Sequence, residues 1–297
     1  MKPIIYYGQN REDLILSAFF PDEKDGFYVD VGAHHPVKDS VTKLFYDKGW
    51  TGINIEPQPK QHKLLKQKRP RDINLQIGIS DKPGKLQLRS YAMDGFSTFS
   101  DSIKKEHKQG KIEGTKKYRD YEVEVDTLGN VFKKHGVKKI SFLKVDVEGL
   151  EYEVLAGNNW NKFRPEVLCI EANHIVKDWR SLLKQNRYSY VLFDGLNEYF
   201  VSHEAEFRIE LFRKTYPDIL VSSSVLSYGW SQQIDKLSAQ LQKVQATLDN
   251  QMHANKQLQE TINQQEKELR SVIALSKRLA KRTVKKLLPI KNNFNKD

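Results

Sequence analysis

The fold is decided by one short stretch, Gly26-Phe27-Tyr28-Val29-Asp30-Val31-Gly32-Ala33. Its apolar run ends in Asp-x-Gly, which predicts a buried strand whose carboxyl end opens into a tight turn. Further along the chain, Thr51-Gly52-Ile53-Asn54-Ile55-Glu56-Pro57 repeats this pattern and again ends on an acid. The segment 40–49 between them has apolar residues at helical spacing and ends on a glycine. The sequence therefore predicts a strand–helix–strand unit of an open α/β sheet.

The ends of these two strands point to a ligand that contains a ribose. In a right-handed crossover, the turn after the first strand and the acid after the second lie side by side at the edge of the sheet. An acid in this place can accept hydrogen bonds from both hydroxyls of a ribose. The glycines that a dinucleotide pyrophosphate needs are absent after Gly32. S-adenosylmethionine, which has no phosphates, therefore fits between Gly32 and Glu56 better than NAD or FAD. An ordinary α/β turn without a ligand is the alternative.

More polar side chains follow two later predicted strands. These strands, 140–149 and 165–174, end in Asp146, Glu148, Glu171, Asn173 and His174. Because side chains alternate along a strand, we expect Asp146 and Glu148 to leave it on the same side. Strands that alternate with helices and end in acids place those acids at one rim of the sheet. A folded core does not require such a rim, so it indicates a functional site.

The rim has the chemistry to remove a proton from a hydroxyl group. We expect Asp146 to be the base or a metal ligand, with Glu148 and His174 as further catalytic residues. Oxygen ligands suit Mg²⁺ rather than zinc, and the candidates for them are Asp146, Glu171 and Asn173. A structural role for Glu148 and Glu171, as helix caps or in ion pairs, is the alternative.

Three further candidate site residues are inferred from their position in the chain. His35 follows the turn of the first strand, where it would contact the acceptor or hydrogen-bond to the backbone. The segment 73–79 alternates as a third strand, and we expect the segment 85–89 to pair with it as a hairpin. Since the end of such a third strand often meets an adenine, Gly78 and Asp81 are candidates for cofactor binding.

The segment 91–120 is the least periodic part of the globular region. It is rich in Lys, Gly and Ser, and it is too long for a simple connection between strands. We expect an insertion that faces the substrate, with disorder as the alternative.

Length and composition limit what the chain can be. Its 297 residues, 38% of them hydrophobic, can form one α/β domain of roughly 200 residues and leave a further segment. No run of 18 apolar residues and no apolar leader is present, so we expect a cytoplasmic protein. The single cysteine, Cys169, excludes an internal disulfide and is expected to be buried. The net charge of +11 is concentrated in residues 276–297, which carry eight Lys or Arg and one acid.

An unbroken heptad pattern begins at Ile234 and continues to Leu279. No proline interrupts it, and ten of its fourteen core positions are apolar. This pattern predicts a coiled coil, whose helix would be roughly 70 Å long at about 1.5 Å per residue. Asn255 at a core position favours a parallel homodimer, with a trimer or a hetero-oligomer as alternatives. We therefore divide the chain into a domain at 1–205, a linker at 206–230, a coiled coil at 231–280 and a basic tail at 281–297.

The basic tail alternates pairs of basic residues with pairs of apolar residues. On a helix, 277–289 would form one basic and one apolar stripe, as in helices that lie on membranes. We expect contact with an anionic membrane surface, peripheral at the inner membrane face. Nucleic acid is not the expected partner, because no aromatic residue precedes Phe294 in the tail to stack on bases. A solvated end of the coiled coil is the alternative.

Several motifs in this order resemble one known family. They are Glu12-Asp13, Asp30-Val31-Gly32-Ala33-His34-His35-Pro36, Gly49-Trp50, Asp126-Thr127-Leu128 and, over 143–157, LKVDVEGLEYEVLAG. From Tyr7 to Val201 the chain resembles the FkbM family of S-adenosylmethionine-dependent methyltransferases. The resemblance implies a class I, Rossmann-like methyltransferase fold, in which helices cover both faces of a seven-stranded sheet whose last strand is antiparallel. Of the three glycines in the general methyltransferase pattern D-x-G-x-G-x-G, only Gly32 is retained.

The resemblance also implies an activity, methyl transfer from S-adenosylmethionine to a hydroxyl (EC 2.1.1). The expected acceptor is a sugar or glycan, as in polysaccharide biosynthesis. The residues expected to bind the cofactor are Asp30, Gly32, Ala33, Glu56, Pro57, Gly78, Asp81 and Asp146. A non-catalytic coiled-coil scaffold that binds S-adenosylmethionine in a glycan-assembly complex is the alternative. An NAD-dependent epimerase or dehydrogenase is disfavoured by the missing glycines.

Overall fold

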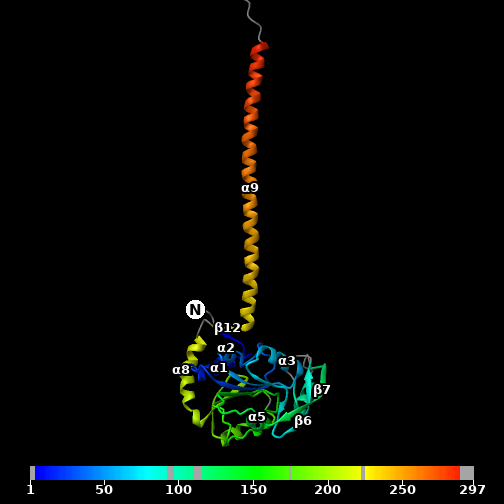
Figure 1. Cartoon of the computed structure of the whole chain (residues 1–297), viewed down its shortest axis with the longest axis vertical. Helices are drawn as coiled ribbons and strands as arrows, with labels where there is room; N and C mark the ends of the chain where they lie inside the picture. The colour runs from blue at the N-terminus through cyan, green and yellow to red at the C-terminus, as the bar shows by residue number, and fades with distance from the viewer. Residues whose placement is uncertain (1–3, 92–96, 110–114, 174, 222–224, 288–297) are drawn as a thin grey trace, which may run out of the picture. The chain divides into compact units, whose positions relative to one another are not determined.

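The computed structural model describes residues 4–91, 97–109, 115–173, 175–221 and 225–287. The chain divides into two units, Met1–Ser231 and Gln232–Asp297. The first unit is an α/β domain, and the second is helical (Figure 1).

The first unit is built on a seven-stranded sheet. Its order is β10-β11-β9-β8-β2-β3-β4, and β11 is antiparallel to both of its neighbours. The remaining neighbouring pairs are parallel. This is the expected sheet with an antiparallel last strand. The strands are β2 (Phe27–Val31), β3 (Thr51–Ile55), β4 (Ile73–Leu75), β8 (Phe142–Val145), β9 (Val167–Glu171), β10 (Tyr188–Phe193) and β11 (Asn197–Ser202).

Helices cover both faces of this sheet, because the strand side chains alternate between two apolar clusters. Val29 lies in the first cluster with residues of α5 (Leu128–Lys134), α6 (Glu151–Ala156) and α7 (Arg180–Gln185). Its neighbour Tyr28 lies in the second cluster with residues of α1 (Glu12–Phe19) and α2 (Lys43–Asp47). Both faces of the sheet are therefore covered by apolar side chains, and polar groups concentrate at the ends of the strands.

A smaller three-stranded sheet contradicts the expected hairpin. The segment 73–79 divides into β4 in the main sheet and β5 (Gly78–Ile79) in the small one. The partner of β6 (Gly84–Tyr91) is β7 (Tyr118–Asp126), over eight antiparallel residue pairs. The 85–89 segment thus pairs with a strand beyond the insertion, because the two residues of β5 offer a much shorter ladder. The insertion itself contains α4 (Asp101–Gln109).

The prediction that the segment 206–230 is a linker is wrong. The segment contains α8 (Phe207–Val221), and Figure 1 shows α8 beside α1. Phe212 of α8 stacks on Phe19 with ring centroids 4.4 Å apart, and the buried Arg208 donates to Glu166. After it, β12 (Val225–Ser227) pairs in parallel with β1 (Ile4–Tyr6). The segment is part of the first unit because it covers the apolar face of α1.

Three shorter features complete the element order. α3 (Pro59–Lys68) follows β3 and begins with a proline in its first turn. A 3₁₀ helix, His203–Ala205, joins β11 to α8. Thr127 caps α5 by accepting a hydrogen bond from the Asn130 amide at 3.1 Å, as the Asp126-Thr127 motif predicts.

The helix α9 (Tyr228–Leu287) has 60 residues and forms nearly all of the described part of the second unit. Its heptad core residues are exposed, with Leu241 at 69% and Val244 at 64%. The pairing of this helix with another chain stays a prediction. Among the described residues, no helix is both long and apolar enough to cross a membrane. The tail at 281–297 lies outside the described residues from position 288 onward.

Candidate functional site

A cavity of about 210 Å³ lies at the carboxyl ends of the parallel strands. Nine residues that the sequence nominated line this cavity. They are Asp30, Gly32, Ala33, Glu56, Pro57, Gly78, Asp146, Glu148 and Glu171. Strands β2, β3, β8 and β9 run in the same direction and bring together all of them except Gly78, which belongs to β5.

Four other nominated residues do not line the cavity in the described part of the chain. The Nδ1 atom of His35 accepts hydrogen bonds from the amides of Val37 and Lys38, so this side chain shapes its own turn. Asp81 is exposed and accepts from Ser80. Asn173 is exposed, and its amide donates to Glu171 at 3.2 Å. His174 lies outside the described residues.

The turn after β2 requires glycine at position 32. Gly32 has φ +82°, and a Cβ atom there would lie 1.8 Å from the carbonyl oxygen of Asp146. The amides of Gly32 and Ala33 both donate to the carbonyl of Ile55, at 3.0 and 3.1 Å. The turn after β2 is thereby held against β3 on one side and against the turn after β8 on the other.

The sequence suggests Lys144 only as a structural ion-pair partner of Glu148 or Glu171, and its pairing with both Asp30 and Asp146 is what sequence reasoning missed. Its ammonium is buried, donates to the Gly32 carbonyl at 3.1 Å, and lies 3.0 Å from Asp146 Oδ2 and 3.4 Å from Asp30 Oδ1. Burial alone would lower the pKa of Lys144, but the carboxylates of Asp146 and Asp30 raise it above its usual value. Thr42 donates to the other oxygen of Asp30. The signal in the sequence was a lysine in the middle of an otherwise apolar strand.

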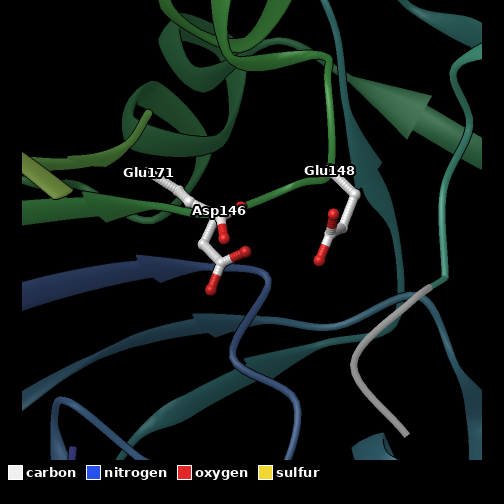
Figure 2. A group of neighbouring side chains, drawn as sticks. All are labelled: Asp146, Glu148 and Glu171. Carbon is white, nitrogen blue, oxygen red and sulfur yellow. The ribbon is translucent and has the colours of Figure 1, made fainter. Parts of the chain in front are cut away.

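Three carboxyl groups converge next to Lys144. Asp146, Glu148 and Glu171 each offer an oxygen, and these atoms lie within 4.8 Å of one another (Figure 2). The reason we expected for this grouping is wrong, because β8 ends at Val145 and both acids lie in the turn beyond it. The backbone of Glu148 is left-handed, with φ +53°. The turn, rather than strand alternation, therefore aims Glu148 at the other two acids.

The three acids differ in their preference for a proton. Burial, and then the charge of Asp146, raise the pKa values of Glu148 and Glu171 well above the usual range. Burial acts in the same direction on Asp146, but Lys144 and a hydrogen bond from Glu171 lower its pKa overall. Asp146 is therefore the acid of the cluster that ionises most readily, whereas Glu148 and Glu171 hold their protons more tightly.

The donor set of this cluster fits a hard divalent cation. Three carboxylate oxygens are ligands that Mg²⁺ accepts, and Glu148 takes the place that was expected for Asn173. Binding would require the two glutamic acids to release their protons. The ammonium of Lys144 beside Asp146 opposes a second positive charge there.

Glu56 forms the other end of the cavity. Its two oxygens accept hydrogen bonds from the amides of His34 and Gln58, both at 2.8 Å. Burial raises the pKa of Glu56 to about 7. Each oxygen retains a second lone pair, so the carboxylate can accept from two further donors once it is ionised.

The insertion also reaches this cavity. Ser97 and Phe99 line it, together with Gly78. A Cβ atom on Gly78 would lie 2.9 Å from the tip of the Phe99 ring, so the ring packs directly on the β5 backbone. The segment expected to face the substrate thus supplies an aromatic wall to the end of the cavity where an adenine was expected.

Comparison with known proteins defines the class. A model of the methyltransferase FkbM domain matches residues 30–190, more than half of the chain. The chain belongs to this family of methyltransferases, which implies the use of S-adenosylmethionine. No curated protein matches the chain. Among solved structures it is similar to a fibrillarin pre-rRNA processing protein from Methanococcus jannaschii, with 15% identity and a TM-score of 0.30 over 61% of this chain and 67% of that one.

Replacing Lys144 by methionine is expected to destabilise the first unit strongly. Asp30, buried beside it, would lose its nearest cation, which costs about 3–5 kcal/mol for a buried pair. Urea unfolding of the full chain measures this loss. The matched control is Lys85→Met, which breaks an exposed pair with Glu122 and is expected to cost little, because solvent screens exposed charges. Equal losses in the two variants would show that Lys144 is not a structural centre.

Proposed function

We propose that this protein transfers a methyl group from S-adenosylmethionine to a hydroxyl group of a sugar or glycan. The observation that carries the proposal is one cavity with two chemically different ends. Glu56 offers paired acceptor oxygens at one end, and Asp146, Glu148 and Glu171 gather at the other. The first end suits the ribose of the cofactor, and the second suits a hydroxyl that must lose its proton.

The cofactor end is formed by residues from three strands and the insertion. Glu56 would accept hydrogen bonds from the ribose hydroxyls, and Phe99 and Gly78 would flank the adenine. The turn at Gly32, which lines the cavity, would pass beneath the methionine part. When bound, S-adenosylmethionine supplies an electrophilic methyl group.

The acid cluster would hold the acceptor and take its proton. Asp146 is already paired with Lys144, which weakens it as a base and suits it to orienting the acceptor hydroxyl. Glu148, whose pKa is raised, is the stronger base in its carboxylate form. Correct placement of the acceptor would itself supply several kcal/mol of the barrier reduction.

Mg²⁺ is a second way to activate the acceptor hydroxyl. Asp146, Glu148 and Glu171 would hold the ion, which would lower the pKa of the bound hydroxyl. Methyl transfer from labelled S-adenosylmethionine to a panel of sugars, measured with and without EDTA, separates the two. Loss of transfer in EDTA and recovery with added Mg²⁺ would support the metal, whereas unchanged transfer would leave Glu148 as the base.

The cofactor end is tested by calorimetric titration with S-adenosylhomocysteine. We expect micromolar binding to the wild type and binding at least a hundredfold weaker to Glu56→Ala, because two charge-assisted hydrogen bonds of about 1.5–3 kcal/mol each are lost. Glu124→Gln, at an exposed position on β7, is the control and should bind like the wild type. A well-folded wild type that does not bind would contradict the proposed cofactor site.

The affinity measured in this titration is expected to increase with pH. Glu56 accepts from two hydroxyls only when it is ionised, and its pKa in the free protein is about 7. Affinity should therefore be highest above pH 7 and fall by up to about tenfold per unit as the pH drops below it. Glu56→Gln cannot titrate, so its weaker binding should not change over this range.

We also propose that α9 pairs in parallel with α9 of a second copy, and that the basic tail contacts an anionic membrane surface. The exposed apolar heptad positions support pairing, since an isolated helix leaves them in water. Sedimentation should give a dimer for the wild type and a monomer for Leu248→Glu.

Anionic vesicles should retain the full chain better than a chain ending at Leu275, and equal retention would contradict membrane contact.

A further inference from the structure

Thr98 is a buried residue in the insertion, and it touches the acid turn. Its side chain is fully buried, and its hydroxyl donates to the backbone carbonyl of Glu148 at 2.7 Å. Its own backbone exchanges two hydrogen bonds of 3.0 Å with Arg89 of β6. Thr98 is therefore fixed by the small sheet on one side and holds Glu148 on the other.

The conformation that Thr98 holds is an unfavourable one. A left-handed backbone is unfavourable for a residue with a side chain, and Glu148 adopts it at φ +53°. Gly149 follows with φ +97°, and a Cβ atom there would lie 2.8 Å from Ile103 of α4. Such a conformation persists only where its surroundings impose it.

Two side chains hold this turn in place. Glu151 Oε1 accepts from the amides of Val147 at 3.3 Å and Gly149 at 3.0 Å. These bonds lie within the turn and its own helix α6. The hydroxyl of Thr98 is the contact from the insertion, separated from Glu148 by 50 positions in the chain.

We propose that Thr98 is a positioning residue for methyl transfer. By holding the Glu148 carbonyl, it keeps the turn left-handed and the Glu148 carboxylate among the other acids. The neighbouring residue Phe99 lines the cofactor end of the cavity. One short segment thus connects the cofactor wall to the position of the base. This inference rests on the proposed function, which assigns the proton to Glu148.

The test compares Thr98→Val, which keeps the shape and removes the hydroxyl, with Thr98→Ser, which keeps the hydroxyl. Thr115→Val is the matched control, because its hydroxyl lies in the same insertion and donates to His107 instead. Labelled S-adenosylmethionine and the sugar panel give kcat and KM. We expect Thr98→Val to lower kcat at least tenfold with the KM for S-adenosylmethionine within twofold. Thr98→Ser and Thr115→Val should stay near the wild type.

The φ angle of Glu148 can be measured without turnover, so it tests the role of Thr98 separately from the proposed function. Crystal structures of the variants should show φ of Glu148 outside the left-handed region in Thr98→Val and inside it in Thr98→Ser. A left-handed Glu148 in Thr98→Val would overturn the positioning role. If the wild type binds S-adenosylhomocysteine but methylates no sugar, the assigned acceptor fails, while the φ of Glu148 still decides the role of Thr98.

Discussion

The site depends on one buried ammonium. Lys144 joins the carbonyl of Gly32 to the carboxylates of Asp30 and Asp146, so it connects the turns after two neighbouring strands. A buried cation is stable only with such partners, and a buried carboxylate is equally dependent on the cation. The glycine at position 32 allows the two turns to approach, because a side chain there would strike the Asp146 carbonyl. Charge and close backbone packing therefore determine the same local geometry.

This arrangement also distributes protons across the acid cluster. Lys144 keeps Asp146 ionised, and the charge of Asp146 in turn favours protons on Glu148 and Glu171. Three similar carboxyl groups thus acquire different properties from their surroundings. The three acids therefore differ in how readily each takes up a proton, and acid–base chemistry depends on such differences.

Other parts of the first unit pack around the sheet and its acidic rim. The insertion lines the cavity through Phe99 and holds the acid turn through Thr98. On the opposite side of the sheet, α8 covers α1 and places Arg208 between Glu23 and Glu166. The residues that line the described cavity all precede the long helix α9, whose exposed apolar positions are the basis of the proposed pairing.

The sequence by itself determined the strands of the main sheet, their order of appearance and most of the rim. Alternating and apolar runs are local signals, and parallel strands bring their carboxyl ends together in any right-handed crossover. The segment 206–230 was misjudged because its apolar positions have meaning only against α1. The partner of β6, the left-handed turn at Glu148 and the role of Lys144 were decided by the tertiary structure alone. Each depends on contacts between residues that are distant in the chain, and a local sequence pattern does not show which distant residues come into contact.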